Sequence, residues 1–222
     1  MNHRHWTEED WSDVMFTDES PFKVFYVPNP KNDSVWGSQE DSVPAADQMK
    51  FSPSVLVWGG MTARGLTTLH FVPHGARLDS QYYVNNILNK AVKQAFQRVS
   101  DEGPVTKRKM FRENTKGIFQ QDGARCHTAA ATLQWLNSNV PAYIRPQDWP
   151  PNSPDLSPIE NMWSILSNKV YRDPEPTNID QLIRRLRSAW NSVTVDTLEA
   201  LVQSMPTRIA EVIRKKGNIL SY

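Results

Sequence analysis

One stretch constrains this chain more than any other: residues 117–127, with the sequence Gly-Ile-Phe-Gln-Gln-Asp-Gly-Ala-Arg-Cys-His. Its β-branched and aromatic side chains lead into Asp122, which predicts a buried strand ending in a carboxylate, and Gly123 is expected to let the backbone turn away. Alanine-rich sequence follows at 128–136 and favours a helix. In open α/β sheets, the carboxyl ends of strands are where active sites lie. An isolated Asp-Gly pair is more often a simple turn, so a catalytic interpretation needs further carboxylates in matching positions.

The composition is typical of one globular domain. The chain has 222 residues, of which 39% are hydrophobic and 22% are charged. Its longest apolar run, at 55–58, is far too short to span a bilayer, and the N-terminus lacks an apolar signal core, so we expect no secretion. Cys126 is the only cysteine, which excludes an internal disulfide and a cysteine-built zinc site.

Charge is distributed unevenly along the chain. Residues 1–48 carry ten acidic and three basic side chains, a net charge of −7, whereas residues 184–222 carry seven basic and three acidic ones, a net charge of +4. A polyanionic partner would therefore meet the C-terminal half of the protein. The alternative for each basic cluster is an ordinary solvated helix face.

Apolar periodicity predicts strands early in the chain and helices later. A short helix capped at Thr7 is expected first, followed by strands at 14–17 and 22–27 paired as a hairpin. Further strands are expected at 54–59, 67–72 and 142–144, with a crossover helix at 79–99. Residues 28–50 predict a long arm, and residues 100–116 a flexible connection.

The C-terminal part is expected to be helical. The proline-dense segment 149–160 leads into a helix that reaches Val170, and three more helices are expected within 178–217. Strands followed by helices, with one crossover helix between them, predict an α/β fold with a mixed sheet flanked by helices.

Two more carboxylates match Asp122. Asp18 also ends a predicted strand, and if the two strands are neighbours their acidic side chains converge at one edge of the sheet. Glu160 lies in the first turn of the helix after the proline-dense segment. Three hard oxygen ligands suit Mg²⁺ or Mn²⁺ rather than zinc. Two such ions about 4 Å apart can activate a water or hydroxyl and stabilise the leaving oxygen in phosphoryl transfer.

Glu160 has a structural alternative. The run Ser157-Pro158-Ile159-Glu160 has the pattern of a capping box, and on sequence alone this role is favoured over metal binding. Asp155 competes as the third carboxylate, although it could equally form an Asx turn. His127 either supports the site from behind or simply begins a helix.

Several segments together carry a more specific resemblance. They are Phe16-Thr17-Asp18-Glu19-Ser20, Val57-Trp58-Gly59-Gly60, the run from Phe119 to His127, the run from Trp149 to Trp163, and the tail at 201–208 with Lys216-Gly217. In these segments and in their order, nearly the whole chain resembles the mariner-like DDE transposases.

The resemblance implies a ribonuclease H-like fold and a two-metal endonuclease and strand transferase that cuts transposon ends and joins them to target DNA. It assigns the catalytic and metal-binding roles to Asp18, Asp122 and Glu160, in preference to the cap, with two Mg²⁺ or Mn²⁺ ions. Asp155 and His127 would support this triad. The 28–50 arm would be the clamp through which such transposases form homodimers. DNA is the implied partner and the nucleus the implied location, with no role at a membrane.

The sequence departs from this family in three places. Between Asp122 and Glu160 lie 37 residues, which is wider than the most familiar spacing, and Gly37 stands where an arginine is common. The helix-turn-helix module that reads transposon ends does not precede these motifs. We therefore expect residues 1–222 to be a catalytic domain alone. Without that module, DNA contacts should come from basic side chains meeting phosphates: Lys107, Arg108, Lys109, Arg184, Arg185 and Arg187.

Two other functions compete with a transposase catalytic domain. One is a catalytically inactive or recruited protein, derived from a transposase, that binds nucleic acid or dimerises. The other is a ribonuclease H-type nuclease acting on RNA–DNA hybrids, which would share the carboxylate geometry but not the flanking motifs. The intact triad favours the transposase, whereas the missing module favours the inactive descendant.

Overall fold

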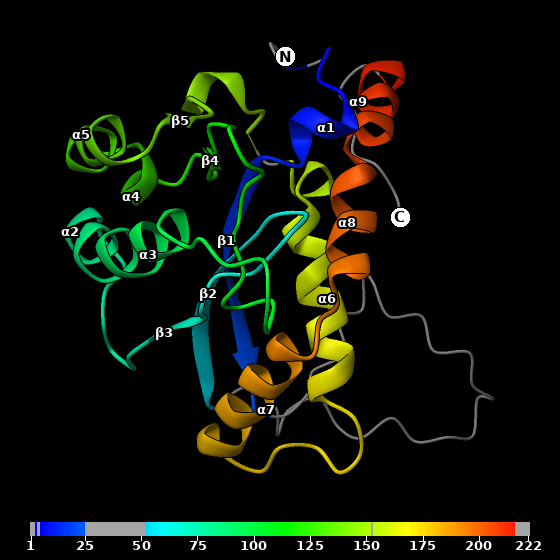
Figure 1. The fold of residues 1–222 in the computed structure, drawn as a ribbon. Helices are drawn as coiled ribbons and strands as arrows, with labels where there is room; N and C mark the ends of the chain where they lie inside the picture. The colour runs from blue at the N-terminus through cyan, green and yellow to red at the C-terminus, as the bar shows by residue number, and fades with distance from the viewer. Residues whose placement is uncertain (1–2, 4, 25–51, 152, 216–222) are drawn as a thin grey trace.

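One mixed sheet organises the protein. The computed structural model describes residues 3, 5–24, 52–151 and 153–215, so the predicted arm at 28–50 and residues 216–217 lie outside the described residues. Within them, five strands follow the order β3-β2-β1-β4-β5 (Figure 1). β1 pairs antiparallel with β2 and parallel with β4. The strands are β1 (Val14–Lys23), β2 (Ser54–Met61), β3 (His70–Val72), β4 (Ile118–Gln120) and β5 (Ala142–Tyr143).

Helices cover both faces of this sheet. Figure 1 shows α2 to α5 on one side of it and α6 to α9 on the other. The helices are α1 (Glu8–Trp11), α2 (Ser80–Tyr82), η2 (Tyr83–Val92), α3 (Lys93–Phe96), α4 (Arg125–Thr128), α5 (Ala130–Asn139), α6 (Pro158–Val170), α7 (Ile179–Asn191), α8 (Val195–Gln203) and α9 (Met205–Arg214). The predicted mixed sheet with flanking helices and a helical C-terminal part is confirmed.

Strand β1 corrects one prediction. The expected hairpin between strands at 14–17 and 22–27 is wrong, because a single strand runs from Val14 to Lys23 and its antiparallel partner is β2. The acidic residues at 18–19 do not end the strand, since β2 pairs with β1 throughout 16–23. Pro21 is tolerated because β4 pairs only with residues 14–16. Among the described strands β2 is therefore the one neighbour of β1 at the proline.

The alternation of side chains along β1 divides the core in two. Val14 and Phe16 belong to the cluster that includes α6 to α9, whereas Met15 belongs to the cluster that includes η2, α3 and α5. Successive residues of a strand point to opposite faces of its sheet. By the same alternation, Asp18 belongs to the α6 face and Glu19 to the opposite face.

The crossover helix is confirmed, with a different end. Asp79 caps it, accepting a hydrogen bond from the backbone N–H of Tyr82 at 2.9 Å. Its middle, η2, is a π-helix, in which Lys93 donates to the carbonyl of Leu88 five residues earlier. The last turn ends at Phe96, so the prediction that this helix extends to residue 99 is wrong, and Val99 is 84% exposed.

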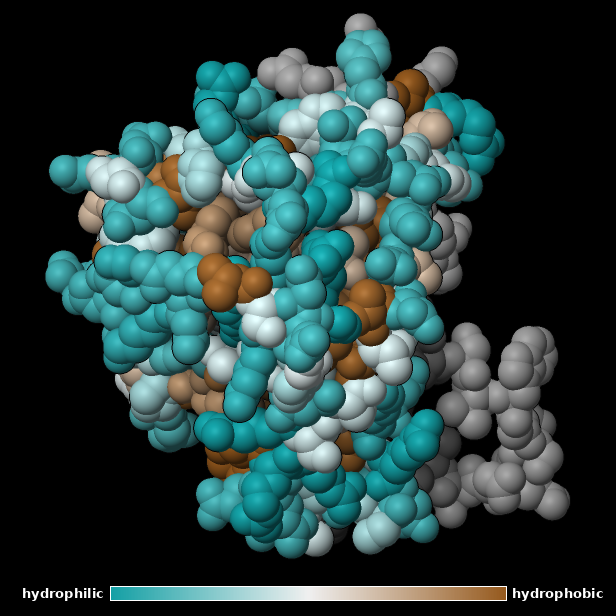
Figure 2. Space-filling model, viewed as in Figure 1, coloured by the Kyte–Doolittle hydropathy of each residue, from teal (hydrophilic) through white to brown (hydrophobic). Residues whose placement is uncertain are grey.

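The alanine-rich segment is helical but interrupted. The segment 128–136 begins at the last residue of α4, and after an extended residue at Ala129 its remainder lies in α5. At the surface, Figure 2 shows a mostly hydrophilic face with small, separate apolar patches. Within the described residues, each helix is too short or too polar to cross a membrane.

Candidate active site

The three predicted carboxylates line one cleft. Asp18, Asp122 and Glu160 border a cavity of about 390 Å³, together with residues of the proline-dense segment 149–157. The sheet explains the first two positions, because Phe16 pairs with Gln120 in parallel register. Asp18 and Asp122 each follow two residues later, so they reach the same edge of the sheet.

Asp18 is a largely buried carboxylate. Its Oδ2 accepts a hydrogen bond from the indole Nε1 of Trp163 at 3.1 Å. Burial, reinforced by the negative charges of Glu160 and Glu19, raises the pKa of Asp18 to about 7. The folded protein therefore holds a carboxylate that would gain from a nearby cation.

Glu160 extends into the cleft and does not cap its helix. The predicted capping box is wrong: α6 begins at Pro158, as expected, but Ser157 makes no side-chain cap hydrogen bond among the described residues. The backbone N–H of Ser157 donates instead to the carbonyl of Pro154 at 3.0 Å. Burial, and then the charge of Asp122, raises the pKa of Glu160.

Asp122 is anchored from two sides. Its Oδ1 lies 2.5 Å from Nδ1 of His127 and accepts a hydrogen bond from the backbone N–H of Ala124 at 3.0 Å. The hydrogen bond with His127 is the main reason why the pKa of Asp122 is lowered. Gly123 is not needed for a left-handed turn: among the described glycines, positive φ occurs at Gly75 and Gly103. The turn after Asp122 is therefore held by side-chain hydrogen bonds.

His127 connects Asp122 to a second carboxylate on the other face of the sheet. The ring is 2% exposed, and its Nε2 lies 3.3 Å from Oε1 of Glu19. The phenol of Tyr83 donates to Oε1 of Gln121, whose Nε2 donates to the backbone carbonyl of His127, each at 3.0 Å. His127 thus contacts Asp122 from within α4, and its supporting role at the site stays a prediction.

The carboxylates share the cleft without forming a compact cluster. Nowhere in the described part of the chain do three His, Cys, Asp or Glu side chains lie close enough together to hold a metal ion. Asp122 instead lies against His127, and Asp18 against Trp163. Carboxylate oxygens from three segments of the chain therefore border one cleft, but they are not arranged as the coordination shell of an ion.

Asp155 occupies the loop before Glu160 but is not among the described residues that line the cleft. Its backbone carbonyl accepts a hydrogen bond from Nη1 of Arg208 at 2.9 Å. The same guanidinium donates to the side chains of Asn161 at 2.6 Å and Ser204 at 2.7 Å. Buried Arg208 on α9 therefore ties the C-terminal helices to the loop that presents Glu160.

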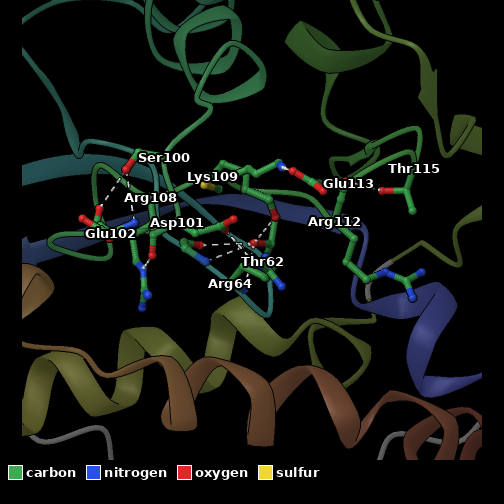
Figure 3. A network of polar contacts seen from close by, with 12 residues as sticks. Thr62, Arg64, Ser100, Asp101, Glu102, Arg108, Lys109, Arg112, Glu113 and Thr115 are labelled. Carbon is green, nitrogen blue, oxygen red and sulfur yellow. Dashed lines mark hydrogen bonds and ion pairs between the residues drawn. The ribbon is translucent and has the colours of Figure 1, made fainter.

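The basic residues 107–109 are not among the described residues that line this cleft, and two of them contact other residues of the segment 100–116. Figure 3 shows Lys109 beside Glu113 and Arg108 beside Asp101. The Arg108 Nε donates to the Asp101 carbonyl at 2.6 Å, and the Lys109 Nζ donates to Glu113 at 3.1 Å. Lys107 is exposed. The segment is irregular, as expected, and its flexibility stays a prediction.

The α7 arginines lie toward the other end of α6 from Glu160. Arg185 donates to the carbonyl of Val170, the last residue of α6, at 3.0 Å. The Arg187 guanidinium lies 5.0 Å from the centre of the Phe71 ring, and Arg184 is exposed. None of the six predicted DNA-contacting side chains is among the described residues that line the cleft.

Sequence reasoning missed the residues that hold the carboxylates in place. Trp163 follows Glu160 by three positions on α6, a spacing that puts both side chains on one helix face and could have revealed it. Glu19 follows Asp18 directly, and strand alternation could have assigned it to the opposite face. No local pattern links Glu19 to His127, which lies 108 residues later.

Comparisons with known proteins identify the family of this chain and several relatives. A family model described as DDE superfamily endonuclease matches residues 13–183. The Tc3 transposase of Caenorhabditis elegans is 32% identical over 217 residues, which cover 96% of this chain and 59% of that protein. The Tc1 transposase of Caenorhabditis elegans is 26% identical over 229 residues, which cover 99% and 74%. This chain thus spans about three fifths of the Tc3 transposase.

Solved structures of the Mos1 mariner transposase share the fold. A paired-end complex with Mn superposes with a TM-score of 0.73 at 16% identity, covering 95% of this chain and 57% of that chain. The Mos1 catalytic domain alone gives a TM-score of 0.65 at 15% identity, with 95% and 85% coverage. The sheet and its helices are thus ribonuclease H-like. The chain belongs to the DDE superfamily of endonucleases and is a homologue of the Tc1 and Tc3 transposases.

Proposed function

We propose that this protein is the catalytic domain of a transposase, a divalent-metal-dependent DNA endonuclease and strand transferase. The observation that carries the proposal is that Asp18, Asp122 and Glu160, from three separate elements, line one cleft. The transposase relatives, which match 96–99% of this chain, support the same function. Attack of water on a phosphodiester would break its P–O3′ bond and free a 3′-hydroxyl. Attack of that hydroxyl on a phosphorus atom of target DNA would form a new phosphodiester and break the target's own P–O3′ bond, releasing a 3′-hydroxyl of the target strand.

Asp18, Asp122 and Glu160 would hold Mg²⁺ or Mn²⁺, in a two-ion site by the family resemblance. The donor set fits, because carboxylate oxygens are the ligands that these cations prefer. The raised pKa values of Asp18 and Glu160 reflect burial and crowded negative charge, which a cation would relieve. When bound, such ions activate a water or hydroxyl and stabilise the leaving oxygen.

The chain's own residues would prepare this site in two ways. His127 holds Asp122 in its ionised form, as the lowered pKa of Asp122 indicates. Trp149 and the prolines of the segment 149–157 line the cleft, where they limit the space beside the carboxylates and so exclude part of the solvent. Since the three carboxylates are not gathered, ion binding would have to draw them together.

DNA is the proposed partner, and one of the related Mos1 transposase structures is a paired-end complex with the left transposon end. Homodimerisation through the 28–50 arm and a nuclear location rest on the family resemblance, and the arm lies outside the described residues. The six basic residues named above are proposed to contact phosphates beyond the cleft.

Plasmid nicking tests the catalytic proposal. Purified protein should nick supercoiled plasmid in Mg²⁺ or Mn²⁺ without sequence preference, and a chelator should stop the reaction. Asp122→Asn should abolish nicking while circular dichroism shows an unchanged fold, because the amide cannot supply an anionic oxygen. Asp155→Asn is the matched control, since Asp155 lies in the neighbouring loop, and it should still cut.

Three results would decide against parts of this proposal. Equal cutting by Asp122→Asn and the parent would mean that the activity has another source. Loss of cutting in Asp155→Asn with retention in Glu160→Gln would move the third carboxylate to Asp155. DNA binding without any nicking by the parent would favour the alternative function, a non-catalytic DNA-binding protein.

A further inference from the structure

Trp163 contacts Asp18 from the interior of the protein. Its indole Nε1 donates to Oδ2 of Asp18 at 3.1 Å, and the side chain is only 4% exposed. Asp18 borders the cleft, whereas Trp163 is not among the described residues that do so. The hydrogen bond therefore reaches the carboxylate from the side opposite the solvent.

Packing on several sides fixes the position of this indole. Trp163 stacks on Trp190 with ring centres 5.5 Å apart and packs against the edge of Phe22 at 6.0 Å. Gly59, which pairs with Asp18 across β1 and β2, leaves the necessary space. A Cβ atom at Gly59 would lie 2.8 Å from Cη2 of Trp163 and 3.1 Å from Cη2 of Trp190. The missing side chain of Gly59 thus admits both rings.

We propose that Trp163 is a positioning residue that holds the Asp18 carboxylate in the orientation required for binding a divalent cation. This role rests on the proposed function of Asp18. Without a partner, the carboxylate could rotate about its side-chain bonds, and the nearby charge of Glu160 would favour orientations directed away from the cleft. The indole N–H is a donor that neither accepts hydrogen bonds nor ionises, so it orients Asp18 without adding a competing positive charge. Partners behind metal ligands often contribute 10–100-fold to metal affinity.

The stacked pair supplies a matched control. Trp190 donates its own indole N–H to the backbone carbonyl of Thr67 at 2.8 Å, and that bond is buried, whereas the bond from Trp163 to Asp18 is partly buried. Trp163→Phe and Trp190→Phe therefore remove the same chemical group from the same pair of rings. Only the first removes a bond to Asp18.

Calorimetric titration with Mn²⁺ alone measures the effect without relying on cleavage. We expect Trp163→Phe to weaken Mn²⁺ affinity about 10-fold, and Trp190→Phe to keep it within about twofold of the parent. Asp18→Asn gives the Mn²⁺ affinity that is expected when one metal ligand is lost. Without metal, the indole N–H resonance of Trp163 should have a different chemical shift in Asp18→Asn than in the parent. In the parent, the same resonance should also shift when Mg²⁺ is added.

The outcomes separate this role from the metal site itself. If the parent binds no Mn²⁺, the proposed metal site fails, and the role of Trp163 fails with it. If the parent binds Mn²⁺ and Trp163→Phe binds equally well, or Trp190→Phe weakens binding as much, the positioning role alone is overturned. If Trp163→Phe does not fold, the indole N–H resonances of the parent and of Asp18→Asn provide the test. The proposal is overturned if the indole resonances are the same in the two proteins and do not change when Mg²⁺ is added to the parent.

Discussion

Asp18 makes the metal-free protein less stable at neutral pH. Its pKa is about 7 in the folded protein, against an ordinary value of 3.8. Between these values the folded protein keeps a proton that the unfolded chain has lost. The contribution of Asp18 to the free energy of unfolding therefore falls as the pH rises from about 4 to about 7. The cost arises because burial and neighbouring carboxylates oppose ionisation.

Replacing this one carboxylate should therefore stabilise the protein. Asp18→Asn is expected to raise the free energy of unfolding by little near pH 4 and by about 2 kcal/mol above pH 7. The whole shift corresponds to about 4 kcal/mol, which we halve because solvent in the cleft screens the charges. The asparagine oxygen can still accept the bond from Trp163. Urea unfolding in a chelator measures the difference, and a gain that does not grow with pH would contradict this explanation.

Single residues also show where sequence reasoning was sufficient. Acidic residues directly after apolar runs led to the expectation that Asp18 and Asp122 would converge if their strands were neighbours. The parallel pairing of β1 with β4 meets that condition, although β1 continues past Asp18. The capping box at Glu160 failed because a local hydrogen-bonding pattern cannot reveal that a cleft lies beside the helix. The bond from Trp163 could not be predicted without knowing that Gly59 lies opposite Asp18.

Among the secondary-structure elements, α9 has an effect beyond its own packing. Arg208 lies outside the span matched by the family model, residues 13–183, yet its guanidinium bonds the Asp155 carbonyl and Asn161 on either side of Glu160. Asn161 is the residue that follows Glu160 in α6. The last described helix thus holds the beginning of the helix that carries a candidate catalytic residue.

Removing this connection should loosen the loop before α6. Arg208→Met is expected to cost about 2–3 kcal/mol, since bonds to a charged group are lost and buried acceptors are left without that donor. Backbone amides of residues 156–160 should then exchange hydrogen faster. Arg214→Met, in the exposed last turn of the same helix, is the control and should change neither. Unchanged exchange at 156–160 in Arg208→Met would show that α9 does not hold this loop.

The elements themselves were predictable where the pattern was local. Helical spacing gave the helix that begins at Pro158, and continuous apolar character gave β2. The expected hairpin failed because its partner was chosen by closeness in sequence, whereas β1 pairs with a strand that begins 31 residues after its own end. Strand partners are set by the tertiary fold, which short-range periodicity does not contain.

Across the whole molecule, contacts within the protein divide the basic residues into two groups. Arg108, Lys109 and Arg185 already donate to protein oxygens, whereas Lys107 and Arg184 are exposed. A side chain held in internal bonds is less able to follow a phosphate. The exposed group should therefore contribute more of the salt-dependent attraction to DNA.

Salt titrations of DNA binding test this division. Binding should be weak, independent of sequence, and reduced by salt. Arg184→Ala should reduce the slope of log affinity against log salt by about 0.9, the contribution of one phosphate contact. Arg185→Gln should change the slope less. Equal changes in both variants, or tight binding to one duplex at high salt, would show that another surface recognises DNA.

The opposite directions of Asp18 and Glu19 in β1 restrict how the length of this protein can vary. Adding or removing one residue earlier in the strand would exchange the faces of the two carboxylates, taking Asp18 from Trp163 and Glu19 from His127. A change of two residues would restore the faces but displace Asp18 by about 7 Å along the strand, away from Gly59. Insertions and deletions in related chains should therefore avoid β1 and accumulate in connections such as the 37 residues between Asp122 and Glu160.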